Sequence, residues 1–137
     1  MAKARIEVTC TEVCPVSVAC ADGSYQSCLE MSRAHSRKLA LCDALERLAD
    51  SLPLALDRLV VLNLASELVP LLRESHRHEE DAVFPAFEAG GANAIARANS
   101  IQRLKAEHVE DECAAQDLTD VLLAIGQKVG DVSENTI

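Results

Sequence analysis

The sequence predicts an all-α fold, because it is rich in helix-forming residues and poor in aromatic ones. Hydrophobic residues make up 49% of the 137 residues but aromatic residues only 2%, so leucine, valine and alanine must form the core. Leucine and alanine are strong helix formers, whereas sheets favour β-branched and aromatic residues. A chain of this length is expected to form one domain that buries a core without disulfides or metals.

The N-terminal segment, residues 1–22, shows no helical period and is rich in cysteine. Cys10, Cys14, Cys20 and Cys28 follow one another at intervals of 4, 6 and 8 residues. Only the first pair approaches the short spacing of zinc knuckles. We therefore expect reduced structural thiols, with a redox role, a disulfide or a cysteine-ligated metal as alternatives. No apolar stretch typical of a signal peptide follows the N-terminus.

The first helix is expected from about Ser24, a plausible N-cap, to Asp50. Apolar residues recur in it every three or four positions, which is typical of the inner face of an amphipathic helix. This stripe consists of Cys28, Met31, His35, Leu39, Cys42, Leu45 and Leu48. It places His35 on the inner face. Cys42 and, later in the chain, Cys113 are expected to be small core residues.

The second helix is expected from about Leu54 to Phe87, with Pro53 at its start and a kink or break at Pro70. Its inner stripe consists of Leu62, Ser66, Val69, Arg73, His76, Glu80, Val83 and Phe87. His78 is rotated by about 200° from His76 on such a helix. It is therefore expected on the surface or beside a metal ligand.

The third helix is expected from about Asn93 to Gly126, after Gly90 and Gly91 end the second. Its inner stripe consists of Ala94, Ala98, Ile101, Lys105, His108, Glu112, Ala115, Thr119 and Leu122. The helical domain would span residues 23–128.

The C-terminal residues 129–137 would be a tail or the start of a fourth helix. Asp131 and Glu134 have the spacing that often opens a helix, which favours the second interpretation.

Each predicted helix thus carries one inward histidine: His35, His76 and His108. Two of these are followed, four residues later, by Glu80 and Glu112, and such i, i+4 residues are neighbours on a helix. A buried carboxylate needs a positive partner, and imidazole with carboxylate suits iron, manganese or zinc. Alternative ligands are Glu79, His78 and Asp111. Without a metal, the same residues would be hydrogen-bonded core histidines and surface ion pairs.

The net charge of the chain argues against two classes of partner. A net charge of −9 leaves no basic surface for nucleic acid or an anionic membrane. No stretch approaches the roughly 20 apolar residues of a membrane span. We therefore predict a cytoplasmic protein.

The stretch SHRHEEDAVFPAF, with RAHSRKL upstream and LKAEHVEDE downstream, resembles the hemerythrin-like (HHE cation-binding) family over about residues 30–125. The family pattern has a histidine on the first helix, then H-x3-E before an apolar-aromatic-Pro step, then a further E-H. The resemblance implies an up-down four-helix bundle around a non-haem di-iron centre. His35, His76 and His108 would be terminal ligands, and Glu80 and Glu112 carboxylate ligands or bridges.

The chain departs from this family at its C-terminal end. Family members carry a histidine and a carboxylate on a fourth helix, and no residues here match them. We predict a hemerythrin-type bundle with three long helices, whose fourth helix is missing or supplied by a partner chain. Because three helices would leave an apolar groove, a homodimer is expected.

The predicted function is that of a di-iron protein that binds or senses O2 or a related small oxidant, such as NO or peroxide. Leu62, Val69, Val83 and Phe87 would keep the pocket dry. Alternatives are iron sequestration or iron sensing without reversible O2 binding, and a helical interaction module with a vestigial metal site. No P-loop, GxGxxG or nucleophile elbow is visible, so we do not expect turnover to be the main role.

Overall fold

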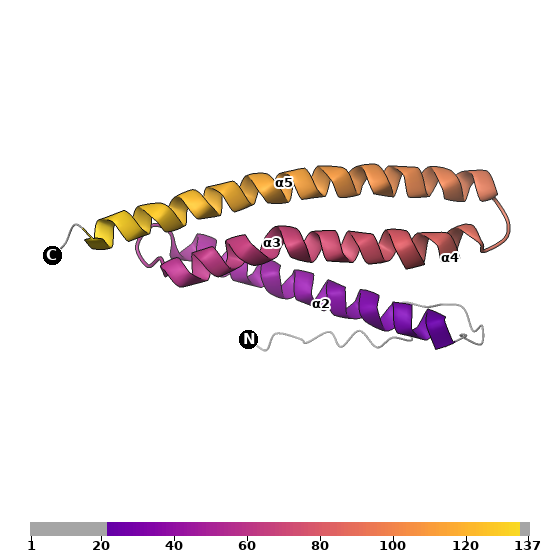
Figure 1. Ribbon diagram of the computed structural model, residues 1–137, viewed down its shortest axis with the longest axis horizontal. Coiled ribbons are helices and arrows are strands. Elements are labelled where there is room, and N and C mark those ends of the chain that lie inside the picture. Colours follow the sequence, from indigo (N-terminus) through magenta and orange to yellow (C-terminus); the bar gives the residue numbers. More distant parts are fainter. Residues whose placement is uncertain (1–21, 135–137) are drawn as a thin grey trace, which may run out of the picture.

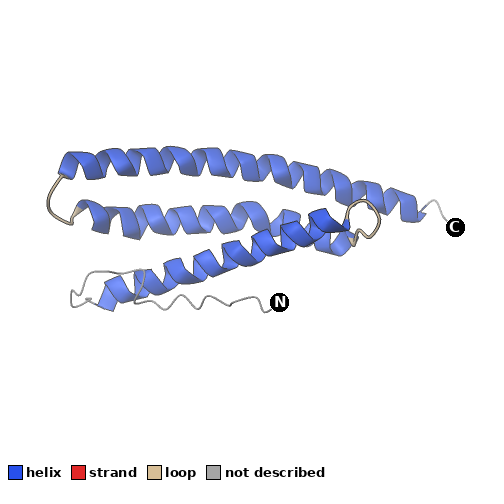
Figure 2. Cartoon of the chain, turned by 180° about the vertical axis from the view of Figure 1, so that it is seen from behind, coloured by secondary structure: helices blue, strands red, loops and turns tan. Residues whose placement is uncertain are grey.

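The computed structural model describes residues 22–134, which form helices and short connections without any strand (Figures 1 and 2). The elements are α2 (Asp22–Ser51), α3 (Arg58–His78), the π-helical segment η1 (Glu79–Val83), α4 (Phe84–Glu88) and α5 (Ala94–Glu134). Because α3, η1 and α4 follow one another directly, they form one rod. The prediction of an all-α fold with long helices is confirmed. The interpretations of Cys10, Cys14 and Cys20 lie outside the described residues.

The rods run up, down and up, with α3 in contact with both of the others (Figure 1). The α3–α5 interface is the most extensive, and the α2–α3 interface is smaller. Direct contact between α2 and α5 is slight at most. α3 is therefore the element that fixes the positions of the other two.

Aliphatic side chains fill one continuous core between the rods. Its buried members are Leu41, Leu48, Val61, Leu64, Ala65, Leu68, Val69, Leu71, Ala115 and Leu122. Burial of a side chain such as leucine contributes about 1.5–3 kcal/mol. The core therefore supplies the main stabilisation of the three-rod arrangement.

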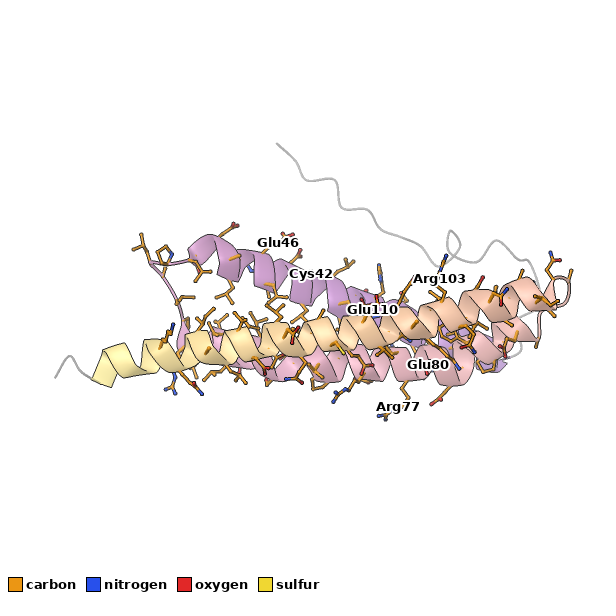
Figure 3. The ribbon with its side chains drawn as sticks, turned by 90° about the horizontal axis from the view of Figure 1, so that it is seen from above. Cys42, Glu46, Arg77, Glu80, Arg103 and Glu110 are labelled. Atoms are coloured by element: carbon orange, nitrogen blue, oxygen red, sulfur yellow. The ribbon has the colours of Figure 1, made fainter. Side chains whose placement is uncertain are left out.

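The inner stripe predicted for α2 is only partly correct, because four of its members are buried or half-buried and three are exposed. Leu41 is buried, whereas His35, Leu39 and Cys42 are exposed. Figure 3 shows Cys42, with Glu46, on the side of α2 that is turned away from α5. One stripe of buried and half-buried positions on α2 consists of Ala34, Lys38, Leu41, Leu45 and Leu48. This set has the same three- and four-residue steps as the predicted stripe, so spacing could not separate the two faces.

The prediction that two helical cysteines are core residues is therefore wrong. Cys42 and Cys113 are both exposed, on α2 and α5. Cys42 follows buried Leu41 and Cys113 follows half-buried Glu112, but a helix turns about 100° per residue, so a sequence neighbour of an inward residue need not face the core.

The second rod begins and bends at other residues than expected. Pro53 lies in the connection, and α3 begins at Arg58 after Asp57, whose side chain accepts a hydrogen bond from the Leu59 N–H at 2.9 Å. α3 also continues through Pro70 as helix. Pro70 is exposed, so water can reach the backbone where the proline removes a hydrogen-bond donor. The change in helix geometry comes later, at η1.

α5 is longer than the sequence predicted. It passes through Gly126 without a break and ends at Glu134, so residues 129–134 continue α5 and do not open another helix. Gly126 is buried against α3: a Cβ on it would lie 2.9 Å from Cδ2 of Leu62. This glycine therefore allows a close approach of two helices. Gly91, with φ +94°, does end a helical region, as expected.

Among the helices of residues 22–134, none combines the length and the apolar character that a membrane crossing requires.

Candidate metal centre

Two buried histidines from different rods lie face to face at the centre of the candidate site. The ring centroids of His76, on α3, and His108, on α5, are 3.9 Å apart, and the ring planes differ by 7°. Their exposed fractions are 4% and 7%. The structure thus places both rings in the interior, where the predicted stripes had put them.

Phe84 covers the other side of this histidine pair. Its ring centroid is 5.6 Å from that of His108, with an angle of 14° between the planes, and the residue is 6% exposed. Phe87, which the sequence suggested as a lining residue, is 44% exposed and lies under the Arg97 guanidinium instead. The motif F-P-A-F therefore contributes its first phenylalanine to the site.

The histidines hydrogen-bond to carboxylates of the opposite rod. Nδ1 of His76 lies 3.0 Å from Oε1 of Glu112, and Nδ1 of His108 lies 2.9 Å from Oε1 of Glu80. The sequence had paired each histidine with the glutamate four residues later on its own helix. The structure brings the same four residues together but exchanges the partners, so each pair joins two rods.

The π-helical segment η1 directs two consecutive glutamates to one histidine. Oε2 of Glu79 lies 3.2 Å from Nε2 of His108, while Glu80 faces the other ring nitrogen. In an α-helix, consecutive side chains point about 100° apart. A π turn holds one more residue and re-aims the side chains within it, and such turns occur frequently at functional sites. Glu79, an alternative ligand in the sequence analysis, thus belongs to the cluster.

Two cationic side chains complete the cluster. Nζ of Lys38 lies 3.5 Å from Oε1 of Glu79, and Nε of Arg73 lies 3.2 Å from Oε2 of Glu112. Lys38 was not among the residues predicted from the sequence. It lies on the stripe of α2 that also contains Ala34 and Leu41, and this stripe has the same spacing as the predicted one.

The pKa of Glu112 lies below its usual value of 4.5. The hydrogen bond from His76 is the largest cause, and the Arg73 guanidinium acts in the same direction, while desolvation opposes both. Glu112 therefore stays ionised, as a metal ligand must be.

Other predicted ligands lie apart from the buried pair. His35 is exposed on α2, and Asp111 is exposed on α5. The inner-face placement of His35 is therefore corrected, because α2 is rotated so that Lys38 faces the cluster instead.

His78 has a structural position between two rods. Its Nδ1 lies 3.2 Å from Oε2 of Glu30, and its Nε2 lies 3.2 Å from both the hydroxyl and the carbonyl oxygen of Ser27. Its side chain is 21% exposed. These contacts tie the end of α3 to the beginning of α2, which accounts for His78 without a metal.

The donor atoms fit a cation in type. The set comprises His76, His108, Glu79, Glu80 and Glu112. Imidazole and carboxylate together suit iron, manganese or zinc. In residues 22–134 no three such side chains are arranged so that they could hold an ion as they stand. The stacked rings and their carboxylates must therefore reorient for an ion to bind.

The same residues do not fit a complete di-iron centre. Only two imidazoles reach the cluster from the described residues, because His35 is exposed. Lys38 and Arg73 also occupy oxygens of Glu79 and Glu112.

Comparison with known families identifies the family of the helical domain. Residues 30–134 match the family model of the hemerythrin HHE cation-binding domain. The match covers most of the chain, which therefore belongs to that family, and the resemblance seen in the motifs is confirmed. No curated protein and no solved structure matches the sequence significantly.

Proposed function

We propose that this HHE domain binds an iron ion between α3 and α5. His76 and His108 would provide nitrogen ligands, and Glu80 and Glu112 carboxylate ligands, while Glu79 would stay beside the ion, paired with Lys38. The observation that carries the proposal is the buried, stacked histidine pair with carboxylate oxygens 2.9–3.2 Å from its ring nitrogens. Zinc and manganese suit the same donors and are the alternatives.

The hydrogen bonds of the cluster explain how its residues would accept an ion. Each imidazole–carboxylate contact, such as that of His76 with Glu112 at 3.0 Å, holds a proton between a nitrogen and an oxygen. Metal ligands must give up such protons, so a cation competes with them and its binding releases them. Phe84, packed over His108, limits the access of water to the ring.

The oxidant prediction extends this proposal. Bound iron would supply an open coordination position for O2, NO or peroxide. The low exposure of His76 and His108 supports such a use, since a site shielded from water protects a bound oxidant from side reactions. A centre with two irons, as the resemblance implies, would need further histidines from outside this sequence, whose four histidines all lie within residues 22–134.

One observation favours a second candidate, an interaction module with a vestigial site. Lys38 and Arg73 already neutralise two of the carboxylates, so the cluster is satisfied without a metal. Iron storage or sensing without O2 chemistry would use the same ligands as the leading proposal and differs from it only in the response to oxidants.

The homodimer and the cytoplasmic location stay predictions. Exposed apolar side chains on α5 support self-association: Val109, Leu118 and Val121 are 64%, 38% and 55% exposed. The mass of the protein in solution tests this, against 14.7 kDa for one chain.

The metal proposal is tested by the iron content of the protein after anaerobic loading with Fe²⁺ and removal of excess metal. We expect about one ion per chain in the wild type and at least about 100-fold weaker binding in His76→Ala, because a direct ligand is lost. His35→Ala is the matched control and should retain wild-type binding, since His35 is exposed. A wild-type chain that retains no iron, zinc or manganese would contradict metal binding and favour the interaction module.

The oxidant proposal needs a separate measurement on the loaded protein. Exposure to air or NO should change its visible absorption spectrum, and His76→Ala should lose this change. Retained iron with an unchanged spectrum would favour storage or sensing of iron.

A further inference from the structure

Lys38 is the residue through which α2 reaches the cluster. Its Nζ lies 3.5 Å from Oε1 of Glu79, and the two side chains are 28% and 23% exposed. The Ser75 hydroxyl donates a hydrogen bond to the same oxygen at 3.2 Å. The other oxygen of Glu79 faces His108. Both oxygens of Glu79 are therefore occupied by groups of the protein.

A lysine ammonium in this position is a fixed positive charge beside the proposed ion. The ammonium is a compact, strongly hydrated charge, and its partial burial is favourable only with an anionic partner. Glu79 is that partner. A metal ion that approaches Glu79 must displace Lys38 or bind next to it, and like charges repel more strongly where water is partly excluded.

The balance of charge in the cluster limits the number of ions. Glu79, Glu80 and Glu112 contribute three negative charges, and Lys38 and Arg73 contribute two positive ones, so the sum is −1 once both histidines have lost the protons that a metal ion displaces. One divalent ion changes this sum to +1, and a second would change it to +3. The Arg73 side chain is 58% exposed, so water screens its charge more than that of Lys38.

We propose that Lys38 is a built-in counter-cation, which holds Glu79 away from the bound ion and restricts the centre to one ion per chain. Lys38 is thus the α2 side chain that contacts the cluster, in place of the predicted ligand His35, which is exposed. This inference rests on the proposed metal binding by the histidine pair. Lys38 acts through Glu79 and is a positioning residue.

The experiment compares Co²⁺ binding, by calorimetric titration of metal-free protein, among the wild type and variants at adjacent positions of α2. Lys38→Met removes the charge and keeps the length of the side chain. Arg37→Met removes the same charge next to it, but Arg37 pairs with exposed Glu74 at 3.2 Å, outside the cluster. Lys38→Arg keeps the positive charge and serves as the conservative variant.

We expect one Co²⁺ per wild-type chain and at least about tenfold tighter binding by Lys38→Met, which corresponds to about 1.4 kcal/mol. Arg37→Met and Lys38→Arg should bind Co²⁺ within about twofold of the wild type. Arg37→Met changes the net charge as Lys38→Met does, but outside the cluster, where salt screens it, and Lys38→Arg keeps the charge beside Glu79. If Lys38 served only to stabilise the fold, Lys38→Met would have a lower unfolding temperature and would bind Co²⁺ no more tightly than the wild type.

Two results would overturn the inference while leaving the metal proposal in place: two ions per wild-type chain, or binding by Lys38→Met that is no tighter than that of the wild type. Should Lys38→Met lose its helical circular dichroism, Lys38→Gln takes its place with the same expectation. Absence of Co²⁺ binding in every protein, together with absence of iron, would instead overturn the metal proposal itself.

Discussion

The interface between α3 and α5 has two halves that are built from different chemistry. In the half nearer the start of α3, Val61 and Leu64 lie in a core with Leu122 of α5. In the other half, the contacts are made by His76, His108 and their carboxylates, with Phe84 as the main apolar cover. The polar half also contains the π-helical segment η1, so the two halves differ in helix geometry as well as in side chains.

The two halves have different roles: the aliphatic half stabilises the fold, and the polar half carries the candidate metal centre. The aliphatic half gains free energy from apolar area removed from water. The hydrogen bonds of the polar half contribute little net free energy of folding, because they replace hydrogen bonds to water. Removal of one partner leaves the other buried without a hydrogen bond, which destabilises the fold. The polar half therefore depends on the aliphatic half to hold its partners in register.

The largest effect is expected from a truncation in the aliphatic half. Leu122→Ala removes a side chain that is 3% exposed and should lower the free energy of unfolding by about 2–5 kcal/mol. Chemical denaturation followed by circular dichroism measures this. Leu123→Ala, at the next position and 40% exposed, is the control and should cost less than about 1 kcal/mol. Equal losses in the two variants would show that α5 does not pack by this face.

A smaller effect on stability is expected when one polar pair is replaced as a whole. His76→Leu combined with Glu112→Leu removes both partners of a hydrogen bond, so the free energy of unfolding of the metal-free protein should change by less than about 1 kcal/mol, or rise. Metal binding should be lost. Denaturation of the double variant measures the first effect and metal titration the second. A loss of stability comparable to that of Leu122→Ala would remove the distinction between the two halves.

The smallest effect concerns the pH dependence of the polar half. The pKa of Glu112 is lowered in the folded protein, chiefly by the His76 hydrogen bond. Its stabilising contribution is therefore complete above the unfolded value near 4.5 and is lost as the pH falls through the lower folded pKa. Glu112→Gln lacks this contribution.

Unfolding temperatures of metal-free protein between about pH 6 and about pH 3 measure the effect. The wild type should lose more stability over this range than Glu112→Gln, whereas Glu110→Gln, at an exposed position of the same helix, should follow the wild type. Parallel curves for all three proteins would show that the carboxylate of Glu112 contributes nothing to the polar half.

Part of the site followed from the sequence. The inner stripes placed His76 and His108 in the interior, and both are buried. They succeeded because buried apolar residues flank each histidine at helical spacing, such as Val69 before His76 and Ala115 after His108. The stripe failed on α2, where alanines and leucines border two faces and the predicted one contained His35, which is exposed.

The sequence by itself determined the all-α class, the approximate extent of the three rods and membership of the HHE family, because helix propensity, apolar periodicity and a local motif are properties of neighbouring residues. Tertiary structure alone decided that His76 pairs with Glu112 and His108 with Glu80, and that Lys38 takes the inward place on α2. The reason is physical. Spacing fixes the stripe on which a side chain lies, but the partner it meets depends on the rotation and register of another helix, which are set by the packing of the whole core.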